Sequence, residues 1–371
     1  MKFVKRFLVF AAAGLCCLAL VYRYFLAGGT LPSGPLRPRE EASTEERRPG
    51  DPRLILLWTT FFGRADYVPP LDTLDCPRSD CLVTSNRSRF RQSDAVVFHL
   101  RDTSPDDLPP ARLSRQKWIL LHHESPPHTP NVLSSLDGLI DWTATYREDS
   151  DVYLSPRPVQ RTEEWEEAEG DRAANKTRMA AWFVSNCNTP GRREDFVREL
   201  RKTLSVDVYG ACGQKSCLPK MSRECLRKAS SEYRFYLSFE NSICKDYVTE
   251  KFFDVLETDM VPVVLGGADY SRIAPPHSYV DALAFESPRR LGRFLIGLAK
   301  DPRRYNRYFD WKKKYRMDNR HYVCQICQKL HAPDAPSTTY GDLNKWWFGD
   351  ANCRSWAPPE ERPGGSPTRA S

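Results

Sequence analysis

The residues best suited to chemistry lie in residues 232–267, where the pattern predicts a strand, a loop, a helix and a second strand. Glu250 and Lys251 fall in the first turn of the helix, which Asp246 or Thr249 can cap. A helix start offers free amide donors and a positive dipole end, so it can hold a phosphate without a glycine-rich loop. Lys251 would add a full charge, and Glu250 could accept hydrogen bonds from sugar hydroxyls. The alternative is that both side chains lie on an exposed first turn and bind no ligand.

The apolar runs around this stretch predict the elements that would position it. Eight segments have the length and apolar character of strands: 54–63, 95–100, 118–126, 138–146, 179–186, 205–212, 233–240 and 261–267. Strands that alternate with longer connections favour an α/β protein with mainly parallel sheets. Within 233–240, large apolar residues alternate with more polar ones such as Glu240, which predicts a half-buried strand. Two such α/β units would enclose a cleft, where open sheets bind ligands.

The first fifty residues differ in composition from the rest. Basic residues precede a long apolar run, so we expect a cytoplasmic tail at 1–6 and a transmembrane signal-anchor helix at 7–26. A cleaved signal peptide is the alternative. Residues 27–53 are rich in proline, glycine and charge, which predicts a disordered stem. The chain's net charge of +7 comes from basic residues mixed with acidic ones, so it gives a mild preference for anionic ligands or membranes and no nucleic-acid signature.

Cysteines and sequons beyond the stem indicate an oxidising, lumenal compartment. Ten of the twelve cysteines follow residue 53, and Asn86-Arg-Ser and Asn175-Lys-Thr are N-glycosylation sequons. We therefore expect structural disulfides, although the CQIC spacing would suggest zinc or redox chemistry in a cytosolic protein. The spacing leaves the pairing open between local bridges and links that tie distant segments. The candidates are Cys76, Cys81, Cys187, Cys212, Cys217, Cys225, Cys244, Cys324 and Cys327.

Seven motifs, taken in order along the chain, resemble the α1,3-fucosyltransferases. They are HHESPPHT, DWTATYREDSDV, AWFVSN, YRFYLSFENSICKDYVTEKFF, VPVVLGGADY, YFDWKKKY and CQIC. Their order and spacing match that family from about residue 54 to residue 350. The resemblance implies a GT-B fold with two Rossmann-like domains facing a cleft. The acceptor-side domain would span 54–172 and the GDP-fucose-binding domain 173–350, with a disordered tail at 351–371.

The same resemblance implies a reaction and roles for single residues. The reaction is inverting transfer of L-fucose from GDP-β-L-fucose to a hydroxyl of N-acetylglucosamine, which needs a base and a stabilised diphosphate leaving group. Glu124 matches the base; the alternative is a loop ion pair with His122 or His123. On the donor side, Arg193 and Lys251 match residues that neutralise the pyrophosphate, and Glu250 would meet the fucose or the ribose. Other residues expected to line the nucleotide pocket are Ser185, Asn186, Tyr236, Asn241 and Tyr247.

Two of these donor-side assignments have alternatives, and one further motif invites a different interpretation. Arg192 adjoins Arg193, and Asn241 could be structural instead. Asp149 and Asp151 form a DxD pattern that binds metal in other glycosyltransferases. Because cationic side chains already supply the charge, we expect a structural turn there, no bound metal and no required cofactor, with a divalent cation such as Mn at most stimulatory.

The acceptor is less defined than the donor. The cysteine-bearing motifs SNCN, VYGACG and ENSICKDY resemble invertebrate and plant members, including those that modify the innermost N-acetylglucosamine of N-glycans, so core transfer is favoured over antennal transfer. The sequence YLSPRP stands where the family usually has Pro-Tyr-Gly, and this departure affects the acceptor-side loop. We expect a single-pass type II protein of the Golgi membrane with a lumenal catalytic part. The alternatives are a catalytically silent lumenal relative that binds glycans or partners, and a transferase for another nucleotide sugar.

Overall fold

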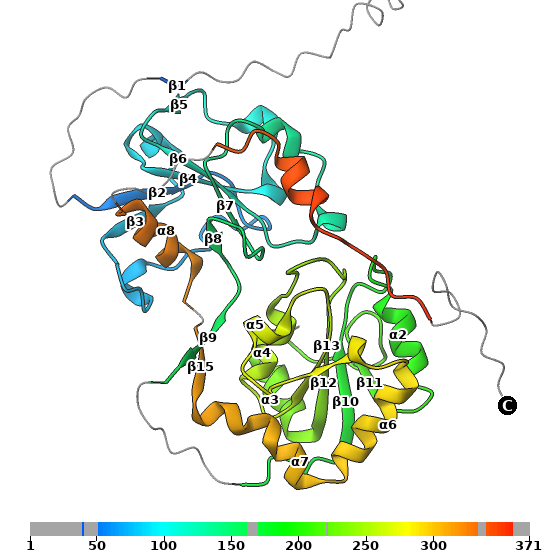
Figure 1. Ribbon diagram of the computed structural model, residues 1–371. Coiled ribbons are helices and arrows are strands. Elements are labelled where there is room, and N and C mark those ends of the chain that lie inside the picture. The colour runs from blue at the N-terminus through cyan, green and yellow to red at the C-terminus, as the bar shows by residue number, and fades with distance from the viewer. Residues whose placement is uncertain are drawn as a thin grey trace, which may run out of the picture.

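The computed structural model describes residues 39–40, 51–161, 170–219, 222–318, 320–332 and 339–358 (Figure 1). The segments expected to form the cytoplasmic tail and the transmembrane helix, and most of the stem, lie outside these residues. In the part of the chain that is described, no helix is both long enough and apolar enough to cross a membrane.

The first lobe is built on a six-stranded parallel sheet of order β3-β2-β4-β6-β7-β8. Its strands are β2 (Arg53–Leu57), β3 (Cys81–Thr84), β4 (Ala95–His99), β6 (Lys117–Leu121), β7 (Trp142–Thr145) and β8 (Val152–Tyr153). Their connections are mostly short 3-10 helices: η1 (Leu71–Thr73), η2 (Arg87–Gln92), η3 (Leu100–Asp102), η4 (Pro105–Asp107), η5 (Pro126–His128) and η6 (Leu133–Leu136). A short parallel pair, β1 (Arg39–Glu40) with β5 (Arg112–Leu113), flanks the sheet.

The second lobe is built on a five-stranded parallel sheet of order β11-β10-β12-β13-β14. Its strands are β10 (Arg178–Phe183), β11 (Val206–Tyr209), β12 (Tyr233–Phe239), β13 (Val261–Leu265) and β14 (Val280–Asp281). Its helices are α2 (Arg193–Leu200), α3 (Arg223–Glu232), α4 (Glu250–Leu256), α5 (Tyr270–Ile273), η7 (Ala282–Ala284), α6 (Pro288–Ala299), α7 (Pro302–Asn306) and η8 (Arg307–Lys313). The predicted α/β fold with parallel sheets is therefore confirmed.

Both sheets begin with the same strand order, in which the first strand lies between the second and the third. The direction of the connections therefore reverses between β2 and β4 in one sheet, and between β10 and β12 in the other. Such switch points leave a crevice at the carboxyl ends of the strands, where ligands bind in open parallel sheets. The topology thus places a binding crevice in each lobe.

Strand β12 is buried on both faces, so the predicted half-buried strand is wrong. Phe235 and Leu237 face one apolar cluster, while Tyr233 and Tyr236 face another. A central parallel strand is covered on both sides by helices, and this coverage overrides the alternation in its sequence. One consequence is that Glu240, expected on the polar face, is completely buried.

The chain crosses between the lobes at an antiparallel pair, β9 (Arg157–Gln160) with β15 (Tyr315–Asp318), as Figure 1 shows. Beyond β15, α8 (Tyr322–Leu330) returns to the first lobe, where Val323 and Ile326 join the core of the first sheet. The π-helical turn η9 (Lys345–Gly349) also packs there through Trp347. These segments of the expected second domain, 173–350, therefore pack on the first lobe, because their apolar faces complete its core.

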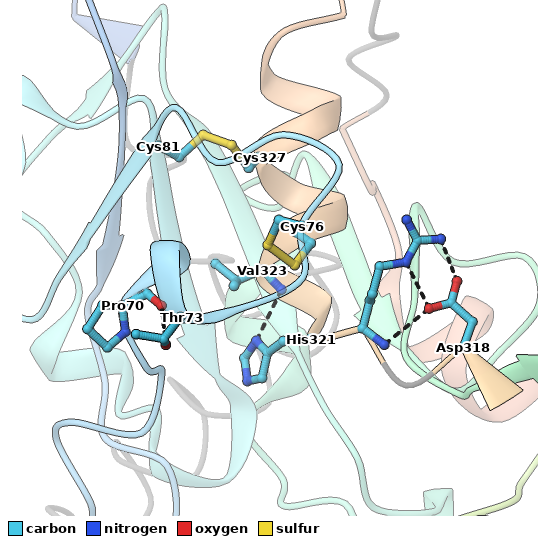
Figure 2. Close-up of a disulfide and its surroundings, with 10 residues drawn as sticks. Pro70, Thr73, Cys76, Cys81, Asp318, His321, Val323 and Cys327 are labelled. Atoms are coloured by element: carbon cyan, nitrogen blue, oxygen red, sulfur yellow. Dashed lines mark hydrogen bonds and ion pairs between the residues drawn. A yellow bond between two sulfur atoms is a disulfide. The ribbon is translucent and has the colours of Figure 1, made fainter.

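Two disulfides fix α8 to the first lobe (Figure 2). Cys76 pairs with Cys324, and Cys81 pairs with Cys327. They span 248 and 246 residues of sequence, so these four cysteines link distant segments and do not form local bridges.

The start of the expected disordered tail is also ordered. Cys353 pairs with Cys244, and Trp356 is buried against Phe196, so residues 351–358 close over the second lobe. The expectation of disorder from residue 351 is wrong for these eight described residues because a disulfide and a buried tryptophan hold them.

Candidate active site

A cavity of about 800 Å³ lies between the two lobes. Five of the catalytic and donor-binding residues selected from the sequence line it: Glu124, Asn241, Tyr247, Glu250 and Lys251. The first lobe also contributes Phe61, Phe62, His123 and Tyr146, and the second contributes Thr249, Phe253, Asp254 and Arg223. One cavity therefore brings together a carboxylate from the first lobe and an ion pair from the second.

Lys251 is held in place by three oxygen-bearing side chains. Its Nζ donates to Thr249 Oγ1 at 3.0 Å and to Glu250 Oε1 at 3.1 Å, and lies 3.6 Å from Glu240 Oε2. Burial alone would lower the pKa of Lys251, but the charges of Glu240 and Glu250 outweigh it, and the pKa is raised. With 20% of its side chain exposed, Lys251 presents a fixed ammonium group to the cavity.

Glu240 anchors this arrangement, and sequence reasoning missed it. It directly follows β12, and its carboxylate accepts hydrogen bonds from Thr249 N at 2.8 Å and from Thr249 Oγ1 at 2.9 Å. Burial raises the pKa of Glu240, and the nearby Lys251 ammonium opposes that shift. The available signal was a glutamate placed where an apolar strand ends, but the alternation assigned it to a solvent-facing side.

Glu250 is one of the second-lobe carboxylates that line the cavity. Its side chain is 56% exposed, although it begins α4 next to Thr249, which bonds the buried Glu240. Burial raises its pKa, but the charge and hydrogen bond of Lys251 outweigh this and leave the pKa lowered. Glu250 is therefore ionised at neutral pH and can accept hydrogen bonds from hydroxyl groups.

The start of α4 itself is less open than the sequence suggested. Thr249, one of the two residues expected to cap α4, is its N-cap. Its Oγ1 accepts a hydrogen bond from the Lys251 amide at 3.4 Å. One of the first-turn amide donors is thus already occupied. The positive charge facing the cavity at this end of the helix comes mainly from the Lys251 side chain.

Glu124 enters the cavity from the opposite wall. It lies three residues after the end of β6 and precedes η5, which begins at Pro126. His122 instead bonds Thr129 through Nε2 at 3.0 Å, and burial lowers the pKa of His123 to about 4, so neither histidine is a cationic partner. Among the described residues no ion pair to Glu124 is formed, which leaves its carboxylate facing the cavity.

Contacts between the lobes hold these two walls opposite each other. Ser125 Oγ donates to Ser242 Oγ at 2.7 Å in a buried hydrogen bond, and Tyr247 packs edge-on against Tyr146 with ring centroids 4.8 Å apart. Because Ser125 adjoins Glu124 and Tyr247 lies on the loop before α4, both contacts fix the loop that carries Glu124 relative to α4.

Comparison with known protein families identifies the family of this chain. The model of the fucosyltransferase N-terminal domain matches residues 50–156, and that of the C-terminal domain of glycosyltransferase family 10 (fucosyltransferase) matches residues 173–346. The chain belongs to glycosyltransferase family 10. It is an enzyme of the α1,3-fucosyltransferase class, as the motifs predicted.

Individual relatives of this fucosyltransferase come from insects and mammals. Alpha-(1,3)-fucosyltransferase C of Drosophila melanogaster is 38% identical over 82% of this chain and 79% of its own length. Glycoprotein 3-alpha-L-fucosyltransferase A of the same species is 37% identical over 76% of this chain and 57% of its own. Human alpha-(1,3)-fucosyltransferase 7 is 37% identical over 90% of this chain and 94% of its own. A crystal structure of an α1,3-fucosyltransferase shares the fold, with a TM-score of 0.51 and 17% identity over 81% of this chain and 96% of that one.

Four of the donor-side residues selected for this fucosyltransferase do not line the cavity. Arg193 is buried and donates to the carbonyl oxygens of Phe239 at 2.7 Å and Asn186 at 3.2 Å. Tyr236 is buried in the core, while Ser185 and Asn186 are exposed beyond the end of β10. Arg193 thus joins the two loops at the β10/β12 switch point. The alternative residue, Arg192, pairs with Asp195 at 2.7 Å.

The two aspartates of the fucosyltransferase's DxD pattern have structural partners. Asp149 accepts two hydrogen bonds from the Arg147 guanidinium, each at 2.7 Å. Asp151 accepts from Thr143 N at 2.9 Å and from the Tyr340 hydroxyl at 2.8 Å. Both carboxylates are therefore engaged in a turn that closes β7 and β8.

All nine cysteines that the sequence selected are in disulfides. Besides the two pairs at α8, Cys187 bonds Cys212 and Cys217 bonds Cys225, and Cys244 pairs with Cys353, which was not among the candidates. Asn86 and Asn175, the two sequon asparagines, are both exposed. This fucosyltransferase thus has its sequons on the surface, where a glycan could attach.

Proposed function

We propose that this enzyme transfers L-fucose from GDP-β-L-fucose, with inversion, to the 3-hydroxyl of N-acetylglucosamine in N-glycans. The observation that carries the proposal is the single cavity with Glu124 on one wall and the Glu250–Lys251 pair on the other. The two parallel sheets on either side of it are arranged as expected of a GT-B enzyme.

In this proposal the second lobe binds the donor and the first lobe supplies the base. Lys251 would stabilise the diphosphate as charge develops on the leaving group, and Glu250 would bond hydroxyls of the donor. Glu124 would take the acceptor proton as the hydroxyl attacks the anomeric carbon from the opposite face. Arg193, behind the cavity, would support the donor loop through the carbonyls that it bonds.

We further propose that transfer needs no metal ion. A fixed ammonium group already faces the position of the diphosphate, and Asp149 and Asp151 are engaged by Arg147, Thr143 and Tyr340. Activity should therefore persist in EDTA, with at most a modest stimulation by Mn²⁺. Loss of activity in EDTA that Mn²⁺ restores would contradict this part of the proposal.

Core N-acetylglucosamine is the acceptor we favour. The cysteine-bearing motifs resemble core-modifying members, and one insect relative is named as a glycoprotein 3-α-L-fucosyltransferase. The human relative matches a larger share of the chain at nearly the same identity, so antennal N-acetyllactosamine is the acceptor against which core transfer must be tested. We place the reaction in the Golgi lumen, on a single-pass type II protein, because of the basic and apolar start, the sequons and the cysteines.

The test uses detergent-solubilised full-length protein, GDP-fucose and two acceptors. One is a glycopeptide that carries a trimmed N-glycan, and the other is N-acetyllactosamine. We expect release of GDP and an α1,3-linked product on the innermost N-acetylglucosamine of the glycopeptide. Faster transfer to N-acetyllactosamine would shift the proposal to antennal glycans. No GDP release above hydrolysis with either acceptor would overturn it and favour a silent binding relative.

A further inference from the structure

Two oppositely charged side chains of the second lobe line the cavity with no hydrogen-bond or ion-pair partner among the residues that the structure describes. Arg223 is the first residue of α3, and Asp254 lies on α4, one turn beyond Glu250. Over the described ranges, neither side chain makes a hydrogen bond or an ion pair. Lys251 and Glu250 differ in this respect, because they already bond each other. Arg223 is exposed and Asp254 is half-buried, so both side chains are open to a ligand that enters the cavity.

Their position relative to the ion pair suggests which part of a ligand they meet. Glu250 and Asp254 are four residues apart, so they lie on the same face of α4, about 6 Å apart along its axis. If the diphosphate lies at Lys251 and the ribose near Glu250, the nucleobase continues along α4 toward Asp254. Arg223, the first residue of α3, also lines the cavity.

The chemistry of this pair fits one base better than the others. Guanine presents two adjacent donors, N1–H and the N2 amino group, and two acceptors, O6 and N7. A carboxylate can accept both donors, and a guanidinium can donate to both acceptors. Adenine has an acceptor at N1 and an amino group in place of O6, so it would set an acceptor against the carboxylate and a donor against the guanidinium. Uracil and cytosine lack the N7 acceptor.

We propose that Asp254 and Arg223 recognise the guanine base of the donor, with Asp254 accepting from N1–H and N2–H and Arg223 donating to O6 or N7. This assignment rests on the proposed function, in which the donor is a guanosine diphosphate sugar. It gives the cavity an end that selects the nucleotide, separate from the Lys251 end, which any nucleoside diphosphate could use.

The ionisation of Asp254 agrees with this role. Burial raises its pKa to about 6, and the neighbouring charges of Glu250 and Glu257 add to the shift, while Arg223 opposes it. The carboxylate is thus ionised at neutral pH, although desolvation makes that form costly. Two hydrogen bonds from a guanine would offset the cost, so guanine recognition should weaken as the pH falls below about 6.

The test compares GDP, IDP and ADP, because IDP differs from GDP only by lacking the N2 amino group. Dissociation constants are measured by calorimetry on the full-length chain in detergent. Wild type should bind GDP about ten- to a hundredfold more tightly than IDP, as expected for one hydrogen bond to a charged acceptor. In Asp254→Asn, GDP binding should weaken until it nearly equals that of IDP. In Arg223→Ala, GDP and IDP should weaken together, since both keep O6 and N7.

The matched control is Asp310→Asn, the same change at an exposed aspartate outside the cavity, which should leave the GDP-to-IDP ratio at its wild-type value. Circular dichroism and the melting temperature check that each variant is folded. An unchanged ratio in folded Asp254→Asn overturns the inference while fucosyl transfer by wild type still supports the proposed function. A wild-type chain that binds none of the nucleotides and transfers no fucose overturns both.

Discussion

Replacing Glu240 with alanine should both destabilise the protein and weaken GDP binding. Glu240 is completely buried, accepts the Thr249 amide at 2.8 Å and lies 3.6 Å from Lys251 Nζ. Removing one member of a buried ion pair costs about 3–5 kcal/mol, since the other charge and its hydrogen-bond donors lose their partner. Here Lys251 keeps Glu250 and Thr249 as partners, so we expect the lower end, about 3 kcal/mol, in urea unfolding at pH 7.5.

Glu240→Gln removes the charge of the side chain but keeps its size and shape, so it separates the effects of the two. It keeps oxygen and nitrogen atoms near Thr249 and removes the costly buried charge, so we expect a smaller loss of about 1 kcal/mol. Because Glu240 helps to raise the pKa of Lys251, the glutamine variant should lose GDP binding at a lower alkaline pH than wild type. Glu199→Gln, at a solvent-facing pair with Lys202, is the control and should change neither property. Wild-type stability and an unshifted pH profile in both Glu240 variants would refute the anchoring role.

Three further predictions concern charge, cross-links and acid. Lys251→Ala should raise the GDP dissociation constant about tenfold or more by calorimetry, and unchanged affinity would remove its role at the diphosphate. Replacing both Cys324 and Cys327 with serine should cost about 5 kcal/mol in urea unfolding, while either change alone costs much less because the remaining disulfide closes nearly the same loop. Burial lowers the pKa of His123 from 6.5 to about 4, so the unfolded chain binds its proton first and stability should fall by about 3 kcal/mol as pH drops through that range. His123→Gln should flatten this loss, and an equally steep pH dependence in the variant would contradict the assignment.

The sequence predicted the strands and the cavity-lining residues closest to them. Apolar runs located β2, β4, β6, β7, β10, β11, β12 and β13, because consecutive buried positions leave a local trace. Glu124, Glu250 and Lys251 lie within a few residues of a strand end or a helix start, so their placement at the cleft follows from the topology. Five selected residues share the cavity for this reason.

What the sequence could not supply depends on contacts between distant segments. Alternation along β12 indicated a solvent-facing side, but the cluster around Tyr233 and Tyr236 covers it, and Glu240 became a buried anchor. The return of α8 to the first lobe, and the pairing of Cys353 with Cys244, join parts of the chain more than a hundred residues apart. No local pattern encodes such partners.

Arg193 illustrates the same limit at the site. Its motif implied a contact with the pyrophosphate, and the fold instead directs its guanidinium to the carbonyls of Phe239 and Asn186. A charged residue next to a switch point can bind a ligand or tie two loops together, and only the three-dimensional arrangement distinguishes the two. Its direct contact with the donor stays a prediction.

The central claim is that the first lobe supplies the base and the second lobe binds GDP. Glu124→Gln tests it most directly, with fucosyl transfer and GDP binding measured in the same preparation. If Glu124 is the base, transfer should fall by about a hundredfold to ten thousandfold, while the GDP dissociation constant stays within about twofold, since Glu124 lies on the wall opposite Lys251. Transfer at the wild-type rate, or a parallel loss of GDP binding in a folded protein, would contradict the central claim.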